Sequence, residues 1–233
     1  NAVTFQNTGT LKLGTARTDT FNFNGGVTEN TSGTVTINAQ IATTNDAVSF
    51  GDISIAGNVS IDTNATNGTG DITVGAVSGS SNTFGLSTGN NISGADITVS
   101  GNISGITTFT LSDVGGTATL SGDVDVTTLT VGNTVANVAL NGNGSTVTNA
   151  VSFANDGTLQ LGDASGDTLT FNGGLDTSDV GGTVTLNGTI ATSNDGIIFD
   201  AVTLGSATTI DTNASSSGAD ITFNGAITGG SNN

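Results

Sequence analysis

The stretch Gly-Thr-Val-Thr-Ile-Asn at residues 33–38 recurs as Gly-Thr-Val-Thr-Leu-Asn at residues 182–187. Successive side chains of a β-strand point to opposite faces, so Val35 and Ile37 face one way while Thr34 and Thr36 face the other. Similar short segments recur along the chain, each followed by Gly, Asn or Asp. The pattern predicts many short strands with an apolar inner face and a threonine-rich outer face.

The recurrence belongs to a duplication that covers most of the chain. It also pairs residues 1–5 with 149–153, residues 23–26 with 171–174, and residues 61–65 with 210–214, with one residue inserted before position 182. The super-repeat is therefore about 149 residues long. We expect a first β-solenoid super-repeat at 1–148 and a partial second one at 149–233, continuous with the first. Since residue 233 aligns near residue 83, we also expect a section of a longer tandem array, or a subunit that continues the stack end to end.

A shorter unit inside the super-repeat predicts the fold class. Most gaps between strand-like segments fit one or two coils of roughly 20 residues, the size of a β-solenoid turn. The absence of proline agrees, because every coil must donate backbone N–H groups to its neighbour along a parallel ladder. We therefore predict an all-β, right-handed parallel β-helix of stacked coils. A β-sandwich or antiparallel barrel ranks second, because neither requires a long tandem duplication. The segments used are 71–74, 96–99, 117–120, 168–171 and 220–223.

The composition excludes several partner classes. The chain has a formal net charge of -17, with Lys12 and Arg17 as its only basic side chains. A surface without a cationic patch does not attract nucleic acid or anionic lipid. No apolar run approaches the roughly 18 residues that a membrane span needs. We therefore expect no nucleic-acid partner and no membrane insertion.

The residue types needed for acid–base or nucleophilic catalysis are scarce. The chain has no His, Cys or Tyr and a single Lys, which removes the usual bases and nucleophiles. The carboxylates considered are Asp62, Asp71, Asp123 and Asp125, and they occupy turn-like or repeated positions without a base beside them. The sequence thus predicts no catalytic residues, no cofactor site and no enzyme. A polysaccharide-active β-helix enzyme stays the third alternative.

Calcium is the ligand that the side chains suit best. Oxygen atoms of Asp211–Asn213 and of Asn45–Asp46 are the type that a hard cation prefers. The Gly-Gly-x-Gly-x-Asp motif of calcium-binding rolls is absent, and Asn or Asp at a solenoid corner is typically part of a side-chain-bonded turn. We therefore predict no metal site, with non-specific Ca²⁺ binding kept open.

Aromatic and threonine positions suggest a core and a surface. Three phenylalanines recur in both copies, which predicts an interior aromatic stack. Outward pairs at Thr128–Thr130 and Thr146–Thr148 suggest a weak likeness to flat ice-binding arrays. Gln160 and Ser165 replace Lys12 and Arg17, so both cations are expected on the surface. The repeated phenylalanines are Phe5, Phe23 and Phe50 with their counterparts Phe153, Phe171 and Phe199.

The run Asp-Ile-Thr-Phe-Asn-Gly-Ala-Ile-Thr-Gly at 220–229, with relatives at 71–79 and 96–105, resembles the repeat regions of giant bacterial secreted proteins of the filamentous haemagglutinin and autotransporter adhesin kind. The resemblance implies a right-handed parallel β-helix shaft, export across the outer membrane, and a place at the cell surface. It also implies roles in adhesion, biofilm matrix or surface filaments.

Together these observations predict a structural repeat module of an extracellular bacterial fibre, filament or adhesin shaft. Its first partner would be itself, through tandem or end-to-end stacking of coils. The alternative is a surface-binding module in which one solenoid face contacts a cell-surface or matrix glycan, a host surface or ice.

Overall fold

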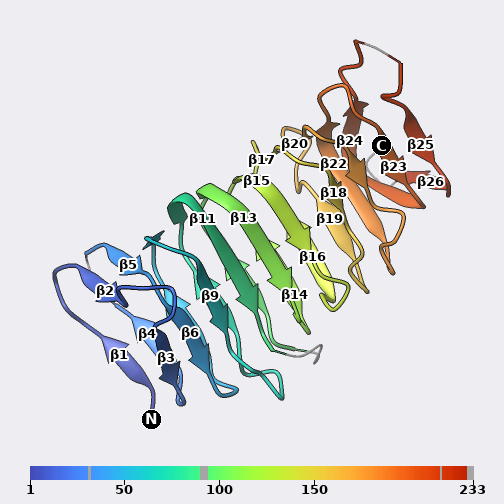
Figure 1. Cartoon of the computed structure of the whole chain (residues 1–233). Coiled ribbons are helices and arrows are strands. Elements are labelled where there is room, and N and C mark those ends of the chain that lie inside the picture. Colours follow the sequence, from blue (N-terminus) through green and yellow to red (C-terminus); the bar gives the residue numbers. More distant parts are fainter. Residues whose placement is uncertain (31–32, 90–93, 216, 230–233) are drawn as a thin grey trace.

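The computed structural model describes residues 1–30, 33–89, 94–215 and 217–229. Regular structure in these ranges consists of β-strands without a helix. The chain winds through about ten stacked coils into an elongated shaft, with β1 (Val3–Phe5) and β26 (Ile227–Gly229) at opposite ends (Figure 1). All strand pairings among the described residues are parallel. The predicted all-β parallel β-helix is confirmed, and the sandwich or antiparallel barrel is excluded.

Each coil has three strand positions, and the strands at one position stack into a row along the shaft, which we call a side. Side one consists of β1 (Val3–Phe5), β4 (Val27–Glu29), β7 (Val48–Phe50), β10 (Ile72–Val74), β12 (Ile97–Val99), β14 (Thr117–Leu120), β16 (Asn137–Leu140), β19 (Leu159–Leu161), the first halves of β22 (Val184–Ala191) and β24 (Val202–Asp211), and β26 (Ile227–Gly229).

Side two follows side one in every coil. It consists of β2 (Leu11–Leu13), β5 (Val35–Ile37), β8 (Ile53–Ile55), the first parts of β11 (Val77–Ser87), β13 (Ile103–Ser112) and β15 (Val124–Val131), then β17 (Thr146–Val147), β20 (Thr168–Phe171) and the second halves of β22 and β24.

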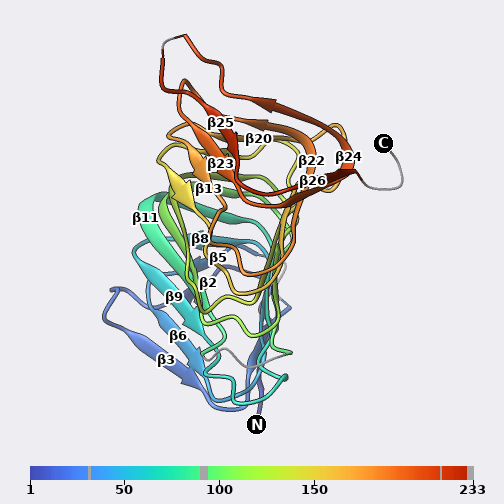
Figure 2. The same ribbon diagram turned by 90° about the vertical axis from the view of Figure 1, so that its right-hand side faces the viewer.

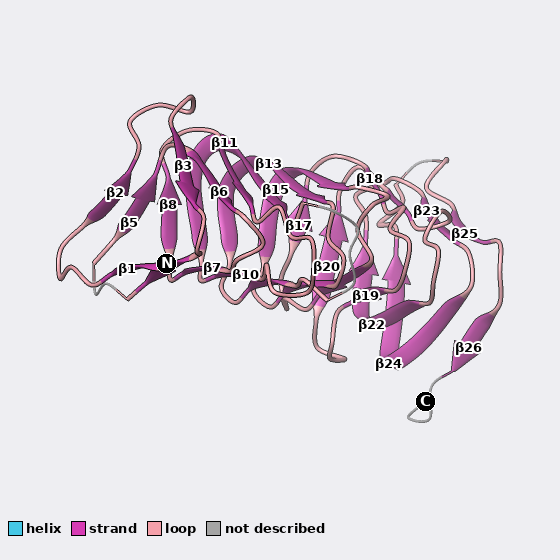
Figure 3. Cartoon of the chain, turned by 90° about the horizontal axis from the view of Figure 1, so that it is seen from below, coloured by secondary structure: helices cyan, strands magenta, loops and turns pink. Residues whose placement is uncertain are grey.

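Side three completes the coil. It consists of β3 (Thr20–Phe23), β6 (Gln40–Thr43), β9 (Val59–Asp62), the second parts of β11, β13 and β15, then β18 (Val151–Ser152), β21 (Leu175–Asp176), β23 (Ile197–Phe199) and β25 (Ile221–Phe223). The ladder of this side is interrupted between β15 and β18, where the backbone hydrogen bond from Asn149 N to Thr127 O (2.8 Å) still joins the two coils. Figures 2 and 3 show the rows of strands following one another along the shaft.

The coils differ in length. The step along side one is shortest from Val184 to Val202 and is among the longest from Ile72 to Ile97. The expected coil of roughly 20 residues lies between these two extremes. The additional residues are accommodated in the turns and in a few irregular positions of the long strands, and the other strand positions stay in register from coil to coil.

The core is built by the alternation seen in the sequence. Val35 and Ile37 are buried, whereas Thr34 is exposed and Thr36 is half-buried. Val35 lies in register with Leu11 of the preceding coil and with Ile53 of the following coil, so equivalent apolar side chains stack along the shaft. One hydrophobic cluster contains residues from both copies of the repeat. Burying each such side chain stabilises the fold by about 1.5 to 3 kcal/mol.

The phenylalanines are interior or partly interior, but they do not form a single stack. Phe199 stacks on Phe223 of the next coil with ring centroids 5.2 Å apart, whereas its counterpart Phe50 lies beside Val74. Strand register thus places Phe50 and Phe199 over different residue types, and the rings pack in small separate groups, the largest of which joins Phe5, Phe21 and Phe23. Among the six repeated phenylalanines, Phe50, Phe153, Phe171 and Phe199 are buried, and Phe5 and Phe23 are partly buried.

The stacked core predicts a sharp contrast between neighbouring positions of β12. Ile97 is fully buried between Ile72 and Ala118, so Ile97→Ala should lower the free energy of unfolding by about 2 to 5 kcal/mol. Thr98→Ala, on the outer face of the same strand, should change it by less than about 1 kcal/mol. Urea unfolding followed by circular dichroism measures both; equal losses for the two variants would contradict the inward orientation of Ile97.

Candidate functional site

The corner carboxylates of the shaft bond to backbone groups one coil away. Asp71 Oδ1 accepts a hydrogen bond from the N–H of Asp96 (2.9 Å), and Asp96 Oδ1 accepts one from the N–H of Thr117 (2.7 Å). Asp52 Oδ1 accepts from the N–H of Ala76 in the same way (2.8 Å). These aspartates therefore satisfy N–H groups at turns, where the ladder of strand hydrogen bonds is interrupted.

Each of the four carboxylates considered for catalysis also accepts a hydrogen bond from a backbone N–H group, three of them across coils and one within its own turn. Asp123 Oδ1 accepts from the N–H of Gly144 (2.8 Å), and Asp125 Oδ1 accepts from the N–H of Thr146 (3.1 Å). Asp71 bonds to Asp96 as described, and Asp62 Oδ1 accepts from the N–H of Asn64 within its own turn (2.9 Å). The structure thus gives each of these carboxylates a turn or coil-to-coil hydrogen bond.

The segments considered for calcium form a corner that is repeated in both copies. Asn64 and Asn213 have positive φ angles of 45° and 46°, and their N–H groups donate to Asp62 and Asp211 at 2.9 and 2.8 Å. Asparagine tolerates this left-handed conformation better than most residues, and the preceding aspartate closes the turn. The duplication has therefore kept the backbone conformation of the corner together with its sequence.

The other half of this corner uses asparagine oxygens in the same way. Asn45 Oδ1 accepts from the N–H groups of Thr66 (2.7 Å) and Asn67 (2.9 Å), and Asn194 Oδ1 accepts from the N–H of Ser215 (2.8 Å). Within the described ranges, no group of three or more acidic, histidine or cysteine side chains is arranged to hold a metal ion. The expected side-chain-bonded turns are confirmed at these positions.

A depression of about 410 Å³ is lined by three acidic side chains: Asp163 and Asp167 from the turn between β19 and β20, and Asp123 from another coil. Asp167 is buried, and its Oδ2 accepts from the N–H groups of Asp163 (2.7 Å) and Ala164 (2.8 Å). Partial desolvation and the adjacent Asp167 carboxylate raise the pKa of the exposed Asp163 above its ordinary value. In the first copy Asp19 takes the place of Asp167, and the backbone N–H groups of Thr15 and Ala16 lower the pKa of its carboxyl.

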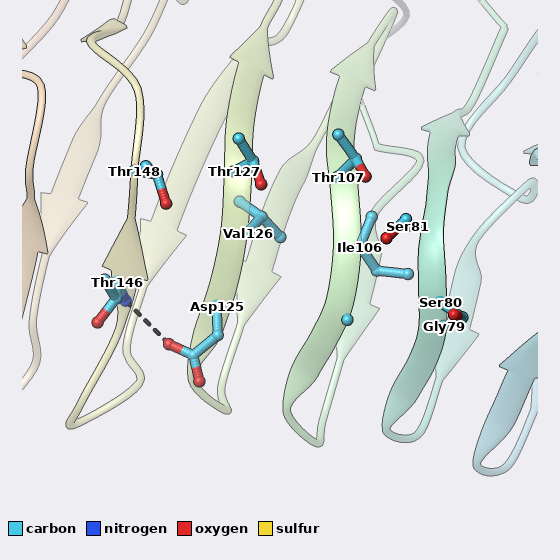
Figure 4. A pocket seen from close by; sticks show the side chains of 11 residues that line it. Gly79, Ser80, Ser81, Ile106, Thr107, Asp125, Val126, Thr127, Thr146 and Thr148 are labelled. Atoms are coloured by element: carbon cyan, nitrogen blue, oxygen red, sulfur yellow. Dashed lines mark hydrogen bonds between the residues drawn. The ribbon is translucent and has the colours of Figure 1, made fainter.

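A larger groove runs along the shaft between sides two and three and was not anticipated from the sequence. It has a volume of about 610 Å³ and crosses β11, β13, β15 and the turn after β17 (Figure 4). The strands are irregular here, with register shifts near Ser81 and Ile106 and a positive φ of 58° at Ser81 and 68° at Gly105. The hollow lies where these irregularities interrupt the regular strands.

The walls of the groove are rich in hydroxyl groups. Thr107, Thr127 and Thr148 lie in a row, one from each successive coil, and Ser81 lies at the end of the row (Figure 4). Asp125 is the acidic member of the described lining residues, and one of its oxygens bonds to the N–H of Thr146. The groove therefore offers a series of hydrogen-bonding groups at intervals of one coil, about 4.8 Å.

The outward threonine pairs do not extend into a lattice. Thr128 and Thr130 lie in register with Thr108 and Thr110 of the preceding coil. One coil further back, Gly85 lies in register with Thr110, and on the other side Asn149 Nδ2 donates to Thr128 Oγ1 (2.8 Å). The cations Lys12 and Arg17 are exposed, as expected.

Comparison of the chain with protein-family models, with curated protein sequences and with solved structures gives no match. The described residues contain no helix long and apolar enough to span a membrane.

The coil-to-coil role of the aspartates predicts a specific response at Asp96. Asp96→Ala removes the acceptor for the N–H of Thr117 and should lower the free energy of unfolding by about 0.5 to 1.5 kcal/mol. Asp96→Asn keeps an oxygen at this position and should retain most of the stability. Asp200→Ala, at an exposed turn, serves as the control for loss of charge. If Asp96→Asn and Asp96→Ala were equally destabilised in urea, the proposed hydrogen bond would not matter to the fold.

Proposed function

We propose that the chain is a structural module of an extracellular bacterial fibre, filament or adhesin shaft, in which tandem copies lengthen the solenoid along one axis. The observation that carries the proposal is the single hydrophobic core that runs through both copies of the repeat, with the side-one ladder continuous across their junction from β16 to β19. Each added coil buries its apolar face against the previous one, so length can increase without any change in cross-section.

Two further observations support a mechanical role. The side chains at the turns, including Asp52, Asp71 and Asp96, are used in hydrogen bonds between coils. The net charge of -17 makes separate shafts repel one another, which favours single extended particles over lateral aggregates. The resemblance of the repeats to bacterial surface filaments supports a location at the cell surface, with the next repeat, or a second copy, as the first partner.

Insertion of one further repeat tests this function. A chain carrying an additional copy of residues 1–148 before its own first residue should form a rod longer by about 32 Å at constant width, since each coil adds about 4.8 Å. Negative-stain electron microscopy and small-angle X-ray scattering measure length and width separately. A particle that becomes wider, or two units joined by a hinge, would contradict the proposal.

A second candidate function is binding of a saccharide in the hydroxyl-lined groove. It is favoured by the row formed by Thr107, Thr127 and Thr148, whose spacing of one coil allows an extended, hydroxyl-bearing chain to form several hydrogen bonds. Side-chain hydroxyls are both donors and acceptors, as sugar hydroxyls are. This function is compatible with a structural shaft and adds a surface to it.

The groove is tested with a panel of neutral and acidic oligosaccharides. The double variant Thr107→Val, Thr127→Val keeps the shape of both side chains and removes two hydroxyls, so affinity for a bound member should fall about tenfold or more. Thr98→Val, on side one, is the control and should bind as the unmodified chain does. Absence of binding across the panel, or unchanged affinity of the double variant, would reject the groove as a saccharide site.

A further inference from the structure

Equivalent strands of the two copies of the repeat lie on different sides of the shaft. Side one begins at Val3 on β1 and continues through successive coils to Val138 on β16 and then to Leu159 on β19. The repeat counterpart of Leu159 is Leu11, which lies on β2 in side two. A strand that belongs to side two in the first copy therefore belongs to side one in the second.

The other two sides show the same displacement. Side two continues from Val126 to Val147 and then to Phe171, whose counterpart Phe23 lies on side three. Side three continues from β15 to β18, which is the counterpart of β1 on side one. On each side, the strands of the second copy are therefore the counterparts of strands that lie on a different side in the first copy. The second copy is turned by one side about the shaft axis.

The displacement follows from the number of strand segments in one repeat. Among the described residues before β18 there are seventeen strands, and three of them, β11, β13 and β15, each supply a segment to two sides. One repeat therefore contains twenty segments, which is six complete coils and two further sides. Because twenty is not a multiple of three, the next copy cannot begin on the side on which the first began.

The turned copy keeps its local geometry. Phe5 and Phe23 pack edge to face with ring centroids 6.2 Å apart, and their counterparts Phe153 and Phe171 do the same at 6.3 Å. The corner at Asn64 likewise recurs at Asn213 with the same turn. Surface features encoded by the repeat are therefore reproduced, but each points in a different direction.

We infer that tandem copies of this repeat present each repeat-encoded surface on the three sides of the shaft in turn, returning to the first side after three copies. The inference rests on the proposed tandem shaft. Three copies span twenty coils, roughly 95 Å at about 4.8 Å per coil. A flat partner lying along one side meets equivalent surfaces only at that interval. A compact partner that contacts one copy can bind from every direction around the fibre.

Disulfide cross-linking tests the displacement in the chain as it is, since it contains no cysteine. Ala139 and Gln160 are in register on adjacent coils, so Ala139→Cys with Gln160→Cys should form an intramolecular disulfide on mild oxidation. If the copies were stacked side for side, β19 would lie over β17, and Thr146→Cys with Gln160→Cys would cross-link instead. The pair Thr119→Cys with Ala139→Cys lies within the first copy and is the positive control.

The outcomes of this test are distinct. Cross-linking at 139/160 and not at 146/160 supports the inference. Cross-linking at 146/160, or failure at 139/160 while 119/139 succeeds, overturns it. Circular dichroism and non-reducing mass spectrometry establish that each variant is folded and that the bond is intramolecular. The result does not depend on fibre formation, so a failure of the proposed shaft function would leave the cross-linking pattern unchanged.

A labelling experiment tests the display directly. Thr44 and Ser193 are repeat counterparts at exposed turns, after β6 on side three and after the second half of β22 on side two. Biotin attached at Thr44→Cys and Ser193→Cys should place two streptavidin molecules on different sides of the rod in negative-stain images. Biotin at Thr44→Cys and Asp200→Cys, both after side-three strands and at a similar axial separation, should place them on the same side. The reverse arrangement would refute the inference.

Discussion

The structure depends on the parallel stacking of one coil on the next. Each coil presents a row of backbone N–H and C=O groups and a set of inward apolar side chains, and neither can be satisfied within a single coil. The register Leu11, Val35, Ile53 on side two shows how both needs are met at once, because the ladder that pairs the backbones also aligns the apolar side chains. At the turns, where the ladder of strand hydrogen bonds stops, carboxylates such as that of Asp96 accept hydrogen bonds from backbone N–H groups of the next coil. The acidity of the chain is in part a consequence of this use of aspartate.

The same constraint explains why a repeat of twenty segments is tolerated. All three sides use strand segments with alternating inward apolar residues. A segment that lies on one side in the first copy can therefore stack on a different side in the second copy. Leu159 lies in register with Val138 on side one, and its counterpart Leu11 lies in register with Val35 on side two. A fold whose sides had different shapes would require a repeat of whole coils. Because the sides are interchangeable, the sequence repeat need not contain a whole number of coils, and the second copy is turned by one side relative to the first.

Much of the fold is visible in the sequence because the alternation at residues 33–38 and the duplication that begins at Asn149 report directly on burial and stacking. The segments 71–74, 96–99 and 117–120 lie on successive coils of side one, so the stacked strands were recognisable from their composition. Coil length was harder to predict, because turns absorb insertions without disturbing the strands. The step from Val184 to Val202 is therefore shorter than the step from Ile72 to Ile97, although both join equivalent strand positions. The displacement between copies follows from the number of strand segments per repeat. That number can be counted only when the register of every strand is known, and the sequence does not show the register.

The candidate site was less accessible from the sequence. Carboxylates and asparagines at the turns were correctly interpreted as side-chain-bonded corners at Asn64 and Asn213, because these residue types favour that conformation wherever they occur. The groove beside Thr107 and Thr127 arises from register shifts within long strands, and such irregularities depend on how neighbouring coils fit together. A sequence pattern typical of one continuous strand does not indicate where such register shifts occur.

The parallel register of successive coils is the central claim, and nuclear magnetic resonance measures it directly. Amide protons of Thr73 should show through-space contacts with residues around Ser49 and Thr98, one coil to either side, without the close Hα–Hα contacts of antiparallel pairs. Strong Hα–Hα contacts between strands adjacent in the sequence would instead indicate hairpins, and the stacked shaft, its fibre function and the turning surface would all be wrong.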